Sequence, residues 1–104
     1  MHLYRVTRNN PPTADDMKSH LDLGRRPTRP QDEEAYREVS VFETREAAAQ
    51  KARARNLGDY VAELEVPEDA IGSRNPASGH VGLRNTTPEQ LLGCVQGIVR
   101  VEDV

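Results

Sequence analysis

The chain has 104 residues, a net charge of −3 and a hydrophobic fraction of 36%. This length suits one domain, spanning residues 1–104, with one hydrophobic core. The acidic balance argues against a nucleic-acid partner or an anionic membrane partner, because proteins that bind either normally carry a positive field.

Further features of the sequence indicate the kind of organism and the cellular compartment to expect. Twelve of the fourteen basic residues are Arg, a bias typical of a GC-rich bacterial genome. Cys94 is the only cysteine, which excludes an intrachain disulfide. No apolar run approaches the roughly 18 residues that a membrane-spanning helix needs, and no basic-then-apolar leader opens the chain, so we expect a cytoplasmic protein.

The first 43 residues predict two strands joined by a polar segment. Tyr and Val favour a strand over His2–Thr7, and a short helix is expected over Ala14–Leu21 with Thr13 as its N-cap. Arg25–Glu34 holds two prolines among many charges and predicts a mobile surface loop. Arg37–Glu43 predicts the second strand.

A helix and the clearest strand of the chain follow. Thr44 is the expected N-cap of an alanine-rich helix over Arg45–Asn56, which we expect Gly58 to end. Asp59–Val66 alternates apolar and polar residues, which predicts a strand with one core face and one largely wet face. The side chains expected toward the core are those of Tyr60, Ala62, Leu64 and Val66, and those expected outside are Val61, Glu63 and Glu65.

The last third of the chain predicts a loop, two strands and a capped helix. The loop is expected over Ile71–Gly79, and the strands over His80–Leu83 and Ile98–Val104. Thr87 followed by Pro88 and Gln90 indicates a helix start, and we expect this helix to run to about Val95. The resulting fold class is α+β: a small, mostly antiparallel sheet with two or three short helices on one side.

Arg5 and His80 are candidate ligand-binding residues. Arg5 shares a strand face with Leu3, and its planar guanidinium presents a fork to phosphate or carboxylate. The alternative is an edge strand whose Arg5 is solvated or paired with Glu63 or Glu65. His80 precedes a strand and is placed to reach a pocket, or it is an ordinary surface histidine.

Ser40, Phe42 and Thr44 form a hydroxyl–aromatic–hydroxyl run at the end of the second predicted strand. Such a run can hold the edge of a ligand between polar groups and an apolar ring. The alternative is structural: Phe42 in the core, Thr44 capping the next helix and Ser40 filling a small gap. Both interpretations stay open at this point.

No metal site or catalytic set is evident from residue spacing. The three histidines, His2, His20 and His80, are scattered, so we expect no metal ligands. Cys94 falls within the last predicted helix and is interpreted as a buried structural thiol. The chain also lacks a glycine-rich phosphate loop and a serine elbow.

The order of elements and four short motifs resemble small bacterial proteins of the ADP-ribosyltransferase-like fold. The motifs are LYR near the start, SVFET, YVAELEVPED, and GH before a capped helix and a final strand. The resemblance implies NAD as ligand, with Arg5 orienting it and Ser40, Phe42 and Thr44 placed against the nicotinamide. It also implies a late Glu or Gln, for which His80–Leu83 offers no counterpart.

Two functions therefore remain. The first is a non-enzymatic interaction or ligand-binding module, which takes a protein partner or a small phosphate-bearing ligand. The second is an ADP-ribosyltransferase-like NAD-binding domain, either catalytically active or inactive. A module that binds a protein requires an exposed apolar patch, whereas the second function requires Arg5, Ser40 and one carboxylate around one cleft.

Overall fold

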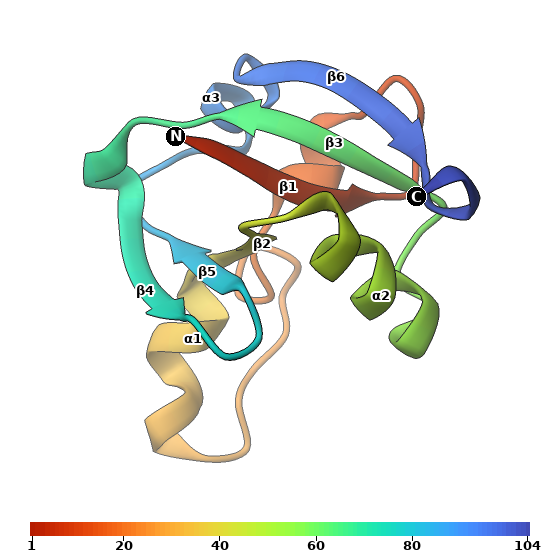
Figure 1. Cartoon of the computed structure of the whole chain (residues 1–104). Helices are drawn as coiled ribbons and strands as arrows, with labels where there is room; N and C mark the ends of the chain where they lie inside the picture. The colour runs from red at the N-terminus through yellow and green to blue at the C-terminus, as the bar shows by residue number, and fades with distance from the viewer.

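The computed structural model describes all residues from Met1 to Val104 and contains six strands and three α-helices (Figure 1). The strands are β1 (His2–Thr7), β2 (Val39–Phe42), β3 (Tyr60–Glu65), β4 (Ile71–Asn75), β5 (His80–Leu83) and β6 (Val95–Arg100). The helices are α1 (Glu33–Arg37), α2 (Arg45–Arg55) and α3 (Pro88–Leu92), and short 3-10 turns lie at Ala14–Met17, Pro30–Asp32, Glu68–Ala70 and Val101–Asp103. None of these helices has the length and apolar character needed to cross a membrane.

The six strands form one antiparallel sheet in the order β4-β5-β2-β1-β3-β6, which confirms the α+β prediction. The sheet divides into two halves at its centre. β1 pairs with β3 from His2 to Thr7, whereas only one pair, Tyr4 with Phe42, joins β1 to β2. The halves β1–β3–β6 and β2–β5–β4 therefore separate beyond that pair, as Figure 1 shows.

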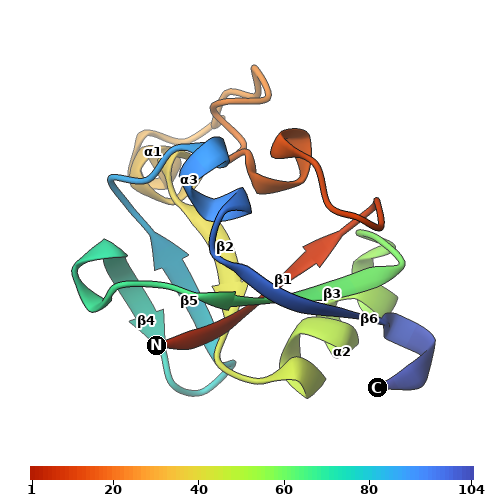
Figure 2. The same ribbon diagram turned by 90° about the horizontal axis from the view of Figure 1, so that it is seen from above.

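Helical segments cover both faces of the sheet, so the expectation that the helices lie on one side is wrong. Helix α2 buries Ala48, Ala49 and Ala52 against Phe42 and Val61. On the other face, Met17 and Leu91 join a separate core cluster with strand residues such as Leu3 and Leu64. Figure 2 shows α2 and α3 on opposite sides of β1 and β3.

The alternation in β3 is confirmed at its second half and modified at its first. Leu64 and Val66 are buried and Glu65 is exposed, as predicted. Val61, expected on a wet face, is also buried, because α2 lies against that face. A strand that is covered on both sides at one end cannot keep strict alternation there.

The segment between β1 and β2 departs most from the prediction. The helix expected over Ala14–Leu21 is a 3-10 turn that ends at Met17, because Lys18 takes an extended conformation. Part of the expected loop forms a 3-10 turn and the start of α1, and β2 begins at Val39 rather than Arg37. The mobility of this segment stays a prediction.

Two further boundaries differ near the C-terminus. The expected loop over Ile71–Gly79 contains β4, an edge strand whose polar residues are compatible with solvent on its free side. Helix α3 ends at Leu92, so Cys94 lies outside any helix and is half-buried. The final strand begins earlier than predicted, at Val95, and Gly97 lies within it.

Gly58 is needed for close packing rather than for ending α2. Asn56, in the left-handed conformation with φ 51°, ends the helix instead. A Cβ added at Gly58 would lie 2.4 Å from the carbonyl oxygen of Thr7. The main chain after α2 therefore packs directly on the end of β1.

We expect Gly58→Ala to lower the free energy of unfolding by about 2–3 kcal/mol, because backbone atoms must move to relieve the contact. Urea denaturation measures this change. Gly93→Ala is the matched control, since Gly93 has φ −68° and its Cβ would meet its nearest neighbour at 3.4 Å. Equal stability of the two variants would contradict the close packing at Gly58.

Candidate functional site

A cleft of about 450 Å³ lies where the two halves of the sheet separate. Its walls come from β1, β2, the start of β5, the last turns of α2, and the first 3-10 turn with the segment that follows it. Four of the five predicted site residues line it: Arg5, Ser40, Phe42 and His80. Thr44 does not, because its hydroxyl caps α2 by accepting from the amide of Ala47 at 3.1 Å.

Arg5 holds three chain segments together at the floor of the cleft. Its Nε donates to the carbonyl of Asp16 at 2.9 Å, Nη1 to that of Ser40 at 2.7 Å and Nη2 to that of Lys18 at 3.2 Å. The Ser40 carbonyl is free for this bond because β1 and β2 do not pair beyond Tyr4 and Phe42. A guanidinium has five N–H donors, so two of those of Arg5 have no partner within the chain.

The charge of Arg5 has no direct carboxylate partner. Burial lowers the pKa of Arg5 to about 10, and the nearby charge of Asp16 acts in the opposite direction. Arg5 is therefore a cation at neutral pH. The alternative drawn from the sequence is wrong on both counts, because β1 is a central strand and Glu63 and Glu65 pair with His2 instead.

Ser40, Phe42 and His80 form one contiguous group on paired strands. Phe42 lies opposite His80 in the register, and their rings meet edge to face with centroids 5.7 Å apart. His80 Nε2 lies 3.1 Å from Ser40 Oγ, within hydrogen-bonding distance. Burial lowers the pKa of His80, with Glu38 opposing the effect and Lys51 adding to it, which favours the neutral ring.

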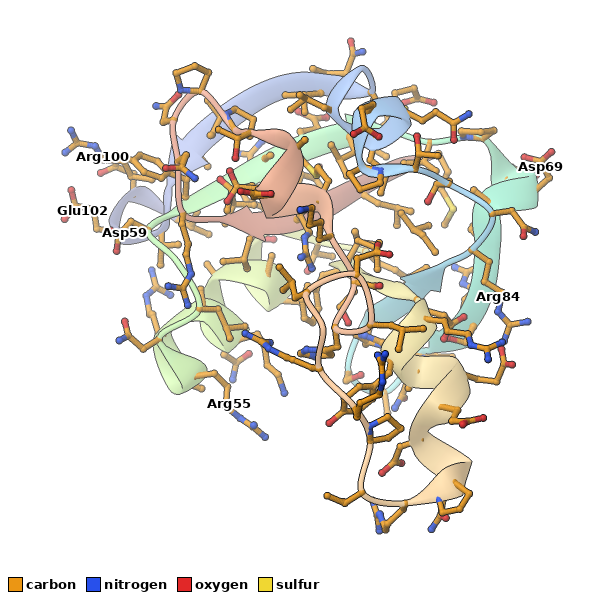
Figure 3. The ribbon with its side chains drawn as sticks, turned by 180° about the vertical axis from the view of Figure 1, so that it is seen from behind. Arg55, Asp59, Asp69, Arg84, Arg100 and Glu102 are labelled. Atoms are coloured by element: carbon orange, nitrogen blue, oxygen red, sulfur yellow. The ribbon has the colours of Figure 1, made fainter.

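Glu38 is a cleft residue that the sequence analysis missed. The side chain is buried, and its carboxylate accepts from Ser73 Oγ and from Arg84 Nε, each at 2.9 Å. Figure 3 shows Arg84 at the edge of the molecule beside α1. The signal was present in the alternation of the second strand, which places Glu38 on the same face as Ser40 and Phe42.

Two glycines make room for this carboxylate. A Cβ on Gly82 would lie 2.6 Å from Glu38 Oε1, and a Cβ on Gly72 would lie 2.3 Å from Glu38 Oε2. The carboxylate thus lies flat over β4 and β5, where the missing side chains leave a slot. Its lone pairs are partly occupied, which limits its freedom to act on a bound ligand.

The cleft is basic although the chain is acidic. Six basic and three acidic side chains line it. Each acidic side chain already has partners within the chain. Asp15 pairs with Lys18 at 2.8 Å, Asp16 accepts local hydrogen bonds, and Glu38 pairs with Arg84. The basic side chains without an acidic partner are Arg5, Arg8, Arg25, Lys51 and Arg55.

Lys51 and Arg55 are two further cleft residues that the sequence analysis did not single out. Their spacing of four residues places both on one face of α2, and this is the signal that was missed. Figure 3 shows Arg55 extending outward from the last turn of α2.

A second hollow, of about 480 Å³, lies between the end of α2 and the end of β6 and contains none of the predicted residues. Its cations are already occupied. Arg53 donates to the carbonyls of Val101 and Val104. Arg100 pairs with Glu102, and Figure 3 labels both at the same end of the molecule. We therefore place the candidate site in the cleft beside Arg5.

No group of three or more His, Cys, Asp or Glu side chains is arranged to hold a metal ion. Comparison of the chain with family models, curated proteins and solved structures finds no match in any of the three. The chemistry of the cleft is therefore the basis for assigning a function.

Proposed function

We propose that this chain is a ligand-binding module for a small phosphate-bearing molecule, with NAD as the ligand to test first. The observation that carries the proposal is the convergence of unpaired cations with Ser40, Phe42 and His80 on one cleft. Unpaired cations in a concave site attract an anion, and the ring and hydroxyl groups offer specificity for a flat polar group.

The size and polarity of the cleft agree with such a ligand. Its volume of about 450 Å³ is in the usual range of small-molecule sites. Arg5 keeps two N–H donors for a phosphate oxygen, and Lys51 and Arg55 add charge from α2. The resemblance to ADP-ribosyltransferase-like proteins favours NAD among phosphate-bearing ligands.

Binding without turnover is the expected behaviour. Glu38, the residue before β2, is the cleft carboxylate on the same strand face as Ser40, and Ser73 and Arg84 occupy it. A carboxylate held in this way is poorly placed to stabilise a positively charged transition state. A protein interface is less favoured, because both exposed large apolar side chains, Leu23 and Leu57, line the cleft.

Removing the two cations of α2 should weaken NAD binding without unfolding the chain. We expect the double variant Lys51→Gln, Arg55→Gln to bind NAD about tenfold or more weakly in titration calorimetry, because two charge-assisted contacts are lost. Both side chains are exposed, so the thermal midpoint should stay close to that of the wild type.

The matched control is Arg37→Gln with Arg100→Gln, which removes the same charge from exposed residues outside the cleft. Its affinity should stay within about twofold of the wild type. Equal weakening in both double variants would mean that NAD responds only to net charge. Absence of NAD binding to the wild type at millimolar concentration would refute the proposed ligand.

A further inference from the structure

Leu23 and Leu57 are the exposed large apolar side chains of the protein, at 47% and 40% exposure, and both line the cleft. They come from different segments, Leu23 from the turn after Ser19 and Leu57 from the residue after the cap of α2. Exposed apolar side chains that gather at one concave site indicate a ligand with an apolar surface of its own.

The hydrogen bonds of the turn that contains Leu23 keep this side chain exposed. The amide of Ser19 donates to the carboxylate of Asp22, and the amide of Asp22 donates back to the Ser19 hydroxyl at 3.1 Å. The amide of Leu23 donates to the Ser19 carbonyl at 3.1 Å, and the amide of Leu21 bonds to Tyr36 at 3.0 Å. This network fixes the turn and holds Leu23 at the cleft.

Leu57 is held by similar means. Asn56 takes the left-handed conformation, and the Leu57 amide donates to the carbonyl of Ala52 at 3.2 Å. A residue in this place often packs on the preceding helix. Leu57 instead stays substantially exposed beside Lys51 and Arg55, the cations of the same helix.

We infer that the ligand is a nucleotide whose base lies between Leu23 and Leu57, while its phosphates meet Arg8, Lys51 and Arg55. A nucleobase is flat and apolar on both faces, which suits two aliphatic side chains. The phosphates attached to the base carry negative charge, and the neighbouring cations have no acidic partner within the chain. This inference rests on the proposed function and names the part of the ligand that the cleft mouth recognises.

The test compares ADP with inorganic pyrophosphate, which has the phosphates but no base. We expect ADP to bind the wild type at least about tenfold more tightly than pyrophosphate. Leu23→Ser and Leu57→Ser should each weaken ADP binding severalfold and leave pyrophosphate binding unchanged. Leu57→Met keeps an apolar side chain and should retain ADP affinity. Thermal unfolding of each variant checks that the fold is kept.

The outcomes separate the inference from the proposed function. If ADP and pyrophosphate bind equally, or if the Ser variants weaken both to the same extent, the base is not held by these leucines, although phosphate binding stands. If neither compound nor NAD binds the wild type, the proposed function fails and the inference fails with it.

Discussion

Arg5→Met should lower the free energy of unfolding by about 3–5 kcal/mol, the largest effect we expect from one side chain. The substitution leaves the carbonyls of Asp16, Ser40 and Lys18 without their donor in a partly buried site. It also removes the contact that joins β1 to β2 where the sheet separates. Urea denaturation of the variant measures the change.

Arg5→Lys tests whether the planar guanidinium group is needed for stability, in addition to its charge. An ammonium group cannot reach three carbonyls in these directions, so we expect roughly half of the stability loss. Arg8→Met is the control, since Arg8 is exposed and its side chain makes no hydrogen bond within the chain. If Arg5→Met is no less stable than Arg8→Met, the three carbonyl contacts do not contribute to the fold.

Asp16→Asn should lower the free energy of unfolding by about 2–3 kcal/mol. The buried carboxylate accepts from the amides of Arg8 and Thr13, each at 2.9 Å, and from Asn9 Nδ2 at 3.1 Å. Burial by itself would raise the pKa of Asp16, but the hydrogen bonds from Thr13, Arg8 and Asn9 together hold it below its ordinary value of 3.8. An Asn side chain replaces one acceptor oxygen by a donor.

The lowered pKa of Asp16 gives this prediction a pH dependence. A carboxylate that titrates lower in the folded than in the unfolded chain contributes its full stability above the ordinary pKa. That contribution disappears as the pH falls below about 4 and through the folded-state pKa. The stability difference between wild type and Asp16→Asn should therefore shrink in acid.

Asp69→Asn is the matched control for this series, because Asp69 is exposed and its side chain makes no hydrogen bond (Figure 3). We expect its stability to follow that of the wild type at every pH. A difference between wild type and Asp16→Asn that is the same at pH 2 and pH 7 would contradict the assigned role of the carboxylate.

Local sequence patterns were sufficient to predict the strands and helices whose two faces have different surroundings. The strand preference of Tyr and Val predicted β1, alternation predicted most of β3, and the Thr44 cap with its alanine-rich sequence predicted α2. The same alternation placed Ser40 with Phe42 on one strand face. These features depend on residues close in the chain, so the sequence carries them directly.

Features that depend on distant residues were missed. Where β1 and β2 separate, Arg5 contacts Asp16, Lys18 and Ser40, and no local pattern encodes contacts between such distant residues. The polar edge strand β4 forms because β5 lies beside it. Leu23 and Leu57 meet the same cleft only once the chain is folded.

The most direct test of the proposed ligand site is amide chemical-shift mapping of the labelled protein with NAD. We predict that the amide signals of Ser40, Leu57 and His80 shift with rising NAD concentration, because all three residues line the cleft. The signals of Arg53 and Glu102, which line the second hollow, should stay in place. Unchanged signals throughout, or shifts confined to the second hollow, would contradict the account.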